Sequence, residues 1–248
     1  MQLENRIALI TGAAGGIGRA IALRFAGEGA AVALCDLDLP GAAKVAEEIR
    51  AAGGRGFAYK LDAAEEQEVR AFFAAFITEH GRLDILVNNA GICRNVKIED
   101  IDGVEWDRFL SVNLKSVFLC SKEALRIMKA QRYGKVISLA SAAGKMGGVV
   151  AGAHYAAAKA GVICFTKSLA LQAAPYGIQA NAIAPGPITT RMTAEWGPEL
   201  TEAFVEKIPL HRYGTPAEVA EVALLLASDR ASFITGEVID INGGLVMD

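Results

Sequence analysis

Short apolar runs alternate along almost the whole chain with longer segments of helical pattern, and this alternation constrains the fold most. Almost wholly apolar runs that are rich in β-branched residues are typical of parallel strands buried on both faces. The runs are Ile7–Ile10, Ala31–Cys35, Gly56–Leu61, Leu83–Val87, Lys135–Ala140, Ile178–Ile183 and Glu237–Ile241. The helical segments are Ile17–Glu28, Gly41–Ala52, Glu65–His80, Glu105–Gln131, Tyr155–Ala174 and Pro216–Ser228. Because crossovers between parallel strands are right-handed, this order predicts a doubly wound α/β fold, with about seven parallel strands and helices on both faces.

The domain organisation follows from the length of 248 residues and from the absence of a Ser/Gly-rich linker, a charge run or an internal repeat. These features predict a single domain over residues 1–248. One long stretch without a strand pattern, Ala184–Gly214, contains four prolines. A segment of that length in a compact domain is usually functional, so we expect a substrate lid or binding loop there.

Composition and charge exclude several classes of partner. The net charge is −3 and 21% of residues are charged, which gives no general attraction to nucleic acid or an anionic membrane. The first residues do not form a signal peptide, and no run reaches the ~18 apolar residues of a membrane span, so we expect a cytoplasmic protein. Four widely spaced cysteines and three scattered histidines predict free thiols and no metal site.

A glycine-rich turn directly follows the first apolar run, in the order Thr11-Gly12-Ala13-Ala14-Gly15-Gly16-Ile17-Gly18. Glycine permits close approach of the main chain to a phosphate, and the helix start that follows supplies free N–H donors. A glycine cluster alone can be only a tight strand–helix turn. Its place in the first βαβ unit predicts a dinucleotide site formed by Gly12, Gly15, Gly16, Ile17 and Gly18.

An acidic residue, Asp36, ends the second run and lies 18 residues after Gly18. This position is near that of the acid that binds the adenosine ribose in dinucleotide-binding folds, although a solvated acid at a strand end is also common. A carboxylate there accepts hydrogen bonds from the ribose hydroxyls of NAD. It repels the additional phosphate of NADP by ~4 kcal/mol at a separation of ~4 Å. The sequence therefore predicts NAD as the cofactor in preference to NADP.

The glycine spacing TGxxxGxG resembles the short-chain dehydrogenase/reductase family, and further marks of that family follow in order. They include an acid after the third run, an NNAG turn, an Asn within a helix, a Ser after the fifth run and a YxxxK pair. The resemblance implies a Rossmann fold and a homotetramer. It also implies cofactor contacts at the third and fourth runs and at the PG motif, from Asp62, Ala63, Asn89, Ala90, Gly91, Pro185, Gly186, Ile188 and Thr190.

Tyr155 and Lys159 are one helical turn apart, so they share one face of a helix. Free tyrosine ionises near ~10, and a nearby ammonium stabilises the phenolate, which predicts a lowered pKa for Tyr155 as catalytic acid/base. Alone, such a pair is most often a surface feature. The resemblance implies that Tyr155 and Lys159 also contact the cofactor. It implies that Ser141 steadies the substrate oxygen and that Asn113 holds a water in a proton relay.

The substrate is less constrained by the sequence. Thirteen residues, Ala142 to His154, separate Ser141 from Tyr155, one more than is common in the family, which predicts an insertion in the loop Gly144–His154. Substrate contacts are expected from Ser141, Lys145, His154, Arg191 and Trp196, although a single loop cation is more often simply solvated. Further pocket candidates are Arg94, Met146, Gly147 and Arg212.

We expect hydride transfer between NAD and a secondary alcohol or ketone, namely a polyol, a sugar or a related compound. The family also contains 3-oxoacyl-carrier-protein reductases, which usually take NADPH, and this alternative stays open. A non-catalytic NAD-binding regulator is a third alternative. Such members typically lack the tyrosine or the lysine, whereas this chain has both.

Overall fold

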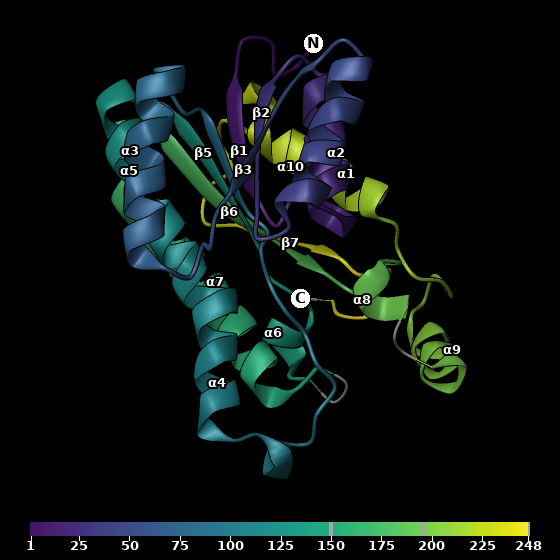
Figure 1. Ribbon diagram of the computed structural model, residues 1–248. Coiled ribbons are helices and arrows are strands. Elements are labelled where there is room, and N and C mark those ends of the chain that lie inside the picture. Colours follow the sequence, from purple (N-terminus) through teal and green to yellow (C-terminus); the bar gives the residue numbers. More distant parts are fainter. Residues whose placement is uncertain (149–150, 195–196, 248) are drawn as a thin grey trace.

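Within residues 1–148, 151–194 and 197–247, which the computed structural model describes, seven parallel strands form one sheet in the order β3-β2-β1-β4-β5-β6-β7 (Figure 1). The strands are β1 (Ile7–Thr11), β2 (Ala31–Asp36), β3 (Arg55–Lys60), β4 (Ile85–Asn88), β5 (Gly134–Leu139), β6 (Ile178–Pro185) and β7 (Val238–Ile241). Every adjacent pair is parallel, so the predicted doubly wound fold is confirmed.

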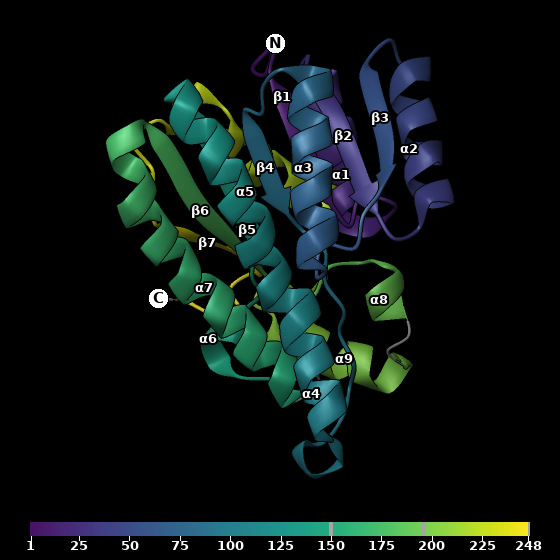
Figure 2. The same ribbon diagram turned by 60° about the vertical axis from the view of Figure 1, so that its left-hand side comes forward.

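Helices cover both faces of this sheet (Figure 2). One layer contains α1 (Gly16–Gly27), α2 (Leu39–Ala51) and α10 (Pro216–Ala227), and the other contains α3 (Glu66–His80), α5 (Ser116–Gln131) and α7 (Ala153–Ala173). Successive side chains of β1 point into different layers, since Ile10 packs with Phe25 and Leu224 whereas Leu9 packs with Phe76. Burial on both faces explains why the strands are almost wholly apolar in sequence.

Four shorter helices lie beyond the carboxyl ends of the strands (Figure 1). They are α4 (Gly103–Leu110), α6 (Ala143–Met146), α8 (Arg191–Ala194) and α9 (Pro198–Lys207). The stretch Ala184–Gly214, predicted as a lid or loop, thus contains two short helices. Proline at the first position of α9 is compatible with a helix start, because that N–H has no partner within the helix.

The helix predicted over Glu105–Gln131 is not a continuous α-helix. A π-helical turn, Ser111–Lys115, separates α4 from α5. Asn113 lies in this turn with its side chain fully buried, and its Nδ2 donates to the carbonyl oxygen of Phe109 at 3.0 Å. The side chain thus competes with the main chain for a helical acceptor, which favours a local change of helix geometry.

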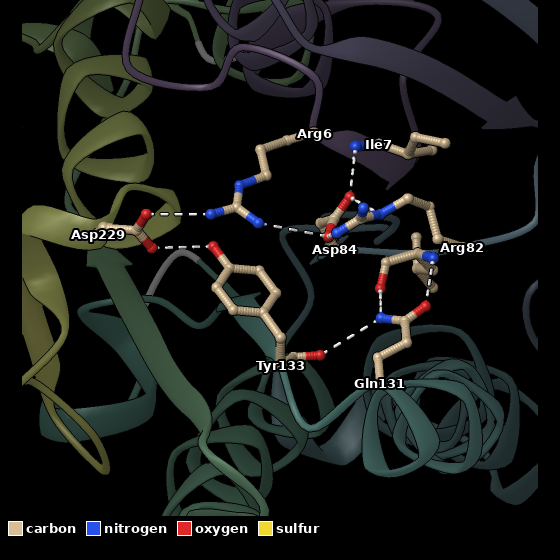
Figure 3. A network of polar contacts seen from close by, with 8 residues as sticks. Arg6, Ile7, Arg82, Asp84, Gln131, Tyr133 and Asp229 are labelled. Carbon is tan, nitrogen blue, oxygen red and sulfur yellow. Dashed lines mark hydrogen bonds and ion pairs between the residues drawn. The ribbon is translucent and has the colours of Figure 1, made fainter.

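The amino ends of the central strands are closed by a polar network (Figure 3). Asp84, fully buried just before β4, accepts from the N–H of Ile7 at 2.8 Å and from Nε of Arg82 at 3.0 Å. Asp229 pairs with Arg6 at 3.0 Å and accepts from the hydroxyl of Tyr133, also at 3.0 Å. These contacts join segments far apart in sequence at the edge of the sheet opposite to the short helices.

The cysteines are all free, as predicted. Cys35 and Cys120 are buried, Cys93 is partly buried and Cys164, on α7, is exposed. In the part of the chain that the structure describes, no helix has the length and apolarity to cross a membrane. Those same residues contain no group of three or more His, Cys, Asp or Glu side chains arranged to hold a metal ion.

Candidate active site

A cavity of about 990 Å³ opens at the carboxyl ends of the strands, where the residues after β1, β2, β4, β5 and β6 line it. Most of the residues singled out from the sequence line it. Those expected to contact a cofactor or to act in catalysis are Gly12, Gly15, Gly16, Ile17, Asp36, Asp62, Ala63, Asn89, Ala90, Gly91, Asn113, Ser141, Tyr155, Lys159, Pro185, Gly186, Ile188 and Thr190. Of the predicted cofactor residues, Gly18 alone does not line the cavity within the described chain.

The glycine turn joins β1 to α1 at one wall of the cavity. Gly12 has a φ of +66°, and a Cβ there would lie 2.8 Å from Cα of Ala90, so a side chain fits neither the conformation nor the space. A Cβ on Gly18 would lie 2.2 Å from the carbonyl oxygen of Gly12, which places Gly18 behind the turn. Gly15 precedes α1 and provides no side-chain cap. The first N–H groups of α1 are therefore available to an anion, which fits a dinucleotide diphosphate.

The NNAG turn after β4 holds the glycine turn in place. The hydroxyl oxygen of Thr11 accepts from the N–H groups of Asn89 and Ala90, each at 3.1 Å. The side-chain amide of Asn89 donates to the carbonyl oxygens of Thr11 at 3.0 Å and Gly12 at 2.8 Å. This clamp was not anticipated from the sequence, where Asn89 is expected only to lie beside the adenosine.

The wall formed by the ends of β2 and β3 is acidic. Asp36 accepts from the N–H of Ala14 at 2.9 Å and from the N–H of Asp38 at 3.0 Å. Among the described lining residues that end or follow β2 and β3, Asp36, Asp62 and Glu65 are acidic and none is basic. This end of the cavity therefore disfavours an additional phosphate on a bound nucleotide.

Tyr155 and Lys159 occupy the first two turns of α7, and both line the cavity. Lys159 is 4% exposed, its Nζ donates to the carbonyl oxygen of Leu139 at 2.6 Å, and it lies 5.7 Å from the ring centroid of Tyr155. Ser141, in the turn after β5, lines the cavity with Tyr155 and acts to lower the pKa of its phenol. A Cβ on Gly144 would lie 2.7 Å from the main chain of Lys159, so α6 packs directly on α7. These contacts bring Ser141, Tyr155 and Lys159 together.

Burial dominates the electrostatics of this group. It lowers the pKa of Lys159 from its ordinary 10.5 to about 8, because the charged ammonium is removed from water. Burial raises the pKa of Tyr155 above its ordinary value, and Ser141 opposes that rise only in part. This direction is opposite to the lowered pKa expected from the sequence. In the protein alone, Tyr155 is held as a protonated phenol, which suits it to donate a proton.

Asn113 is bound on all sides by the main chain. Its Oδ1 accepts from the N–H of Ile92 at 3.1 Å, and its Nδ2 donates to the carbonyl oxygen of Ile92 at 3.0 Å as well as to that of Phe109. A Cβ on Gly91 would lie 2.7 Å from Oδ1 of Asn113 and 3.6 Å from Nζ of Lys159. Asn113 therefore fixes the chain after the NNAG turn next to Lys159, and its part in a water relay stays a prediction.

The expected substrate residues are placed differently from one another. Arg191, at the start of α8, is exposed and lines the cavity, as do Met146 and Gly147. Lys145 is not among the described lining residues, and its Nζ pairs with Asp240 of β7 at 2.5 Å. Arg94 and Arg212 form ion pairs with Glu105 and Glu218 instead. Trp196 lies outside the described residues.

His154 is fully buried and is also absent from the described lining of the cavity. It lies between α7 and α4, where its ring is stacked on Phe109 with 3.6 Å between the centroids. The expectation that it reaches substrate is therefore not met in this structure.

Two exposed cations at the cavity were not anticipated from the sequence. Arg108 of α4 and Lys207 of α9 line it together with Arg191. Like Arg191, neither has a side-chain hydrogen bond or an ion pair with another described residue. They come from three separate helices, so no linear motif could have grouped them. The part of the described lining that comes from α4, α8 and α9 is thus basic, whereas the end at β2 and β3 is acidic.

Comparison with known proteins shows similarity to reductases over almost the whole chain. A family model described as enoyl-(acyl carrier protein) reductase matches residues 12–246. The 3-oxoacyl-(acyl-carrier-protein) reductase of Staphylococcus aureus is 44% identical over 244 residues, which cover 98% of this chain and 99% of that protein. This relative aligns over its full length.

Two solved structures are closely similar to this one. That of a 3-oxoacyl-(acyl-carrier protein) reductase from Brucella melitensis has a TM-score of 0.93 and 40% identity, and the match covers 100% of this chain and 93% of that chain. That of a putative gluconate dehydrogenase from Agrobacterium tumefaciens has a TM-score of 0.95 and 33% identity, with 99% and 98% covered. The fold alone does not separate the two activities.

Proposed function

Because the chain belongs to the short-chain dehydrogenase/reductase family and is an oxidoreductase of that family, we propose that it reduces the 3-oxo group of acyl thioesters with NADH. The observation that carries this proposal is that Ser141, Tyr155 and Lys159 line one large cavity together with an uncapped helix start. The first of these features suits proton transfer to a carbonyl oxygen, and the second suits a dinucleotide diphosphate.

The residues of the chain divide the chemistry among them. When bound, the dinucleotide supplies the hydride for reduction or accepts it in the reverse direction. Tyr155 donates its phenolic proton to the substrate oxygen, and Ser141 donates a hydrogen bond to the same oxygen as negative charge develops on it. Lys159, held by the carbonyl of Leu139, places a positive charge beside the phenolate that remains.

The choice of substrate rests on the relatives and on charge. The sequence alone favoured a polyol or a sugar, but the reductase relatives at 40–44% identity support the thioester alternative. Acyl thioesters on carriers bear a phosphodiester on the carrier arm, and Arg108, Arg191 and Lys207 offer cations for it. A sugar acid is the second candidate, since its carboxylate suits the same cations and a putative gluconate dehydrogenase has a closely similar structure.

The proposal of NADH rests on Asp36. Its carboxylate lies at the cavity wall where the adenosine ribose is expected, and the neighbouring described lining residues offer no cation to bind a 2′-phosphate. Asp36 is already fixed by two main-chain N–H groups, so its position does not depend on a ligand. We therefore expect a higher kcat/KM with NADH than with NADPH.

The test follows nicotinamide absorbance with acetoacetyl-coenzyme A as the oxidant, and with gluconate and a polyol panel in the oxidative direction. We expect turnover of the thioester with NADH, and loss of that turnover in Tyr155→Phe with NADH binding retained. Tyr176→Phe, outside the described cavity lining, is the matched control and should stay active. Turnover of gluconate alone would favour the second candidate. Unchanged turnover in Tyr155→Phe would contradict the assigned chemistry, and NADH binding without turnover of any compound would favour a regulator.

A further inference from the structure

His154 lies directly before Tyr155 in a buried contact that the proposed chemistry does not use. The side chain is 0% exposed and its ring lies parallel to that of Phe109, with 6° between the planes and 3.6 Å between the centroids. On its other side the ring meets Gly152, where a Cβ would lie 2.7 Å from Cε1 of His154. The ring is thus held between α4 and the start of α7.

Both ring nitrogens of His154 have partners. Nδ1 accepts from the main-chain N–H of Tyr155 at 2.7 Å, so the ring proton of the neutral form belongs on Nε2. Nε2 faces Oε1 of Glu105, 3.4 Å away. Glu105 in turn binds Nη1 of Arg94 through both carboxylate oxygens, each at 2.9 Å. This chain of contacts joins the loop after β4, α4 and the N–H of the catalytic tyrosine.

The start of α7 has no other side-chain anchor within the described chain. Its N-cap residue is Gly152, which provides no side-chain hydrogen bond, and the first turn has no acidic residue. Helix starts leave N–H groups unpaired, so a first turn without a cap is weakly held. One turn later, Lys159 is fixed by the carbonyl of Leu139. The N–H of Tyr155 also donates to the carbonyl oxygen of Gly152 at 3.0 Å, so the main chain holds the first turn in part. His154 adds a side-chain contact to this N–H, and its own ring is fixed by Glu105 and Phe109.

From this geometry we infer that His154 is a positioning residue, which holds the first turn of α7 so that the hydroxyl of Tyr155 reaches the substrate oxygen. The inference rests on the proposed role of Tyr155 as the proton donor. It reassigns His154 from a substrate contact to a support of the catalytic residue. Since a displacement of ~1 Å at a reacting group can cost ~100-fold in rate, loss of this support is expected to lower kcat with little change in cofactor affinity.

The experiment compares four variants with the wild type in NADH-dependent reduction of acetoacetyl-coenzyme A. His154→Phe keeps a ring against Phe109 but removes both nitrogens, whereas His154→Asn keeps an acceptor beside the N–H of Tyr155. His80→Phe is the matched control, because His80 is also a mostly buried ring that packs on Phe76 and contacts the hydroxyl of Tyr59. It differs in its place, since it ends α3 and is not among the described residues that line the cavity. Tyr155→Phe tests the proposed chemistry itself.

We expect His154→Phe to lower kcat by about tenfold to a hundredfold, with KM for NADH and the stoichiometry of NADH binding within about twofold of wild type. His154→Asn should recover most of that loss, and His80→Phe should stay within about twofold of wild type even if its Tm falls. If His154→Phe does not fold, Glu105→Gln takes its place, with an expected fall in kcat of at least about threefold.

The inference is overturned if His154→Phe keeps the wild-type kcat, or if His154→Asn is as slow as His154→Phe. It is also overturned if the fall in kcat of His154→Phe is fully explained by a smaller number of NADH-binding sites per protein. Where Glu105→Gln replaces His154→Phe because the latter does not fold, an unchanged kcat in Glu105→Gln overturns the inference. The outcome for Tyr155→Phe separates the two proposals. If Tyr155→Phe loses turnover and His154→Phe does not, only the positioning role fails. If Tyr155→Phe keeps turnover, the proposed function fails with it.

Discussion

Replacement of Lys159, to which we assign a catalytic role, by methionine (Lys159→Met) is predicted to make the protein more stable at neutral pH while it removes activity. Lys159 is 4% exposed, and burial lowers its pKa from 10.5 to about 8. At 1.36 kcal/mol for each pH unit, this difference corresponds to about 3 kcal/mol of destabilisation by the buried ammonium at pH 7. Methionine has a similar length and no charge, so it removes this cost. The lost hydrogen bond to Leu139 offsets about 1–2 kcal/mol of the gain.

The pH dependence gives a sharper test than the single value at pH 7. Between about pH 8 and 10.5 the unfolded chain keeps the lysine proton while the folded protein has lost it, so the stability contributed by this group rises with pH. The free energy of unfolding of wild type relative to Lys159→Met should therefore increase by about 2–3 kcal/mol from pH 7 to pH 10. Below pH 8 the difference should be constant.

The measurement is urea unfolding at several pH values, with the free energy of unfolding extrapolated to water. Lys167→Met, the same substitution at an exposed lysine of α7, is the control and should follow the wild-type curve. Turnover of Lys159→Met should fall by at least about a hundredfold. Parallel stability curves for wild type and Lys159→Met between pH 7 and 10 would refute the reasoning, because they would mean that the buried lysine titrates as it does in the unfolded chain.

Three further substitutions test the cofactor site and the fold. Asp36→Asn should lower the preference for NADH, measured as kcat/KM with NADH divided by kcat/KM with NADPH, by about tenfold to a thousandfold. The reason is that a repulsion of up to ~4 kcal/mol between the carboxylate and the 2′-phosphate of NADPH is removed. A preference of the wild type for NADPH would contradict this. Gly18→Ala should abolish NADH binding in a fluorescence titration, since its Cβ would lie 2.2 Å from the carbonyl oxygen of Gly12, whereas Gly27→Ala, in open space on the same helix, should bind normally. Asp84→Asn should cost about 1–3 kcal/mol in urea unfolding, because the buried carboxylate loses its charged contacts with the partly exposed Arg6 and Arg82, yet leave the kcat of folded protein unchanged. A fall in kcat of Asp84→Asn would contradict this expectation, because it would mean that the network at the amino ends of the strands affects the site at their carboxyl ends.

Much of the fold could be predicted from the sequence because buried parallel strands leave a strong apolar signal. The strand over residues 178–185, for example, begins at the predicted residue and extends two residues beyond the predicted end. The break at Asn113 could not be predicted, since its side chain is held both by the carbonyl group of Phe109, one turn earlier, and by that of Ile92, which only the fold brings near. The start of α2 was also missed, because the helix begins at Leu39, two residues before the predicted Gly41, with Asp38 as its N-cap.

In the candidate site, too, some residues could be predicted from local sequence and others could not. The cofactor and catalytic residues belong to local motifs at strand ends, and a parallel sheet brings all carboxyl ends to one edge. The positions of Lys145 and His154 depend on partners far away in sequence, Asp240 and Glu105, which no local pattern identifies. The basic end of the cavity likewise comes from separate helices.

The clamp between Thr11 and Asn89 constrains the order in which the molecule can assemble. The two residues are separated by 78 positions, so the turn at Gly12 has its full set of hydrogen bonds only after β4 has paired with β1. Contacts of such long range form late, because the intervening chain must first be ordered. During synthesis, a nascent chain that ends before Gly91 therefore exposes an incomplete phosphate loop. Competence to bind nucleotide is acquired in one step, when the two halves of the sheet meet at its central strand.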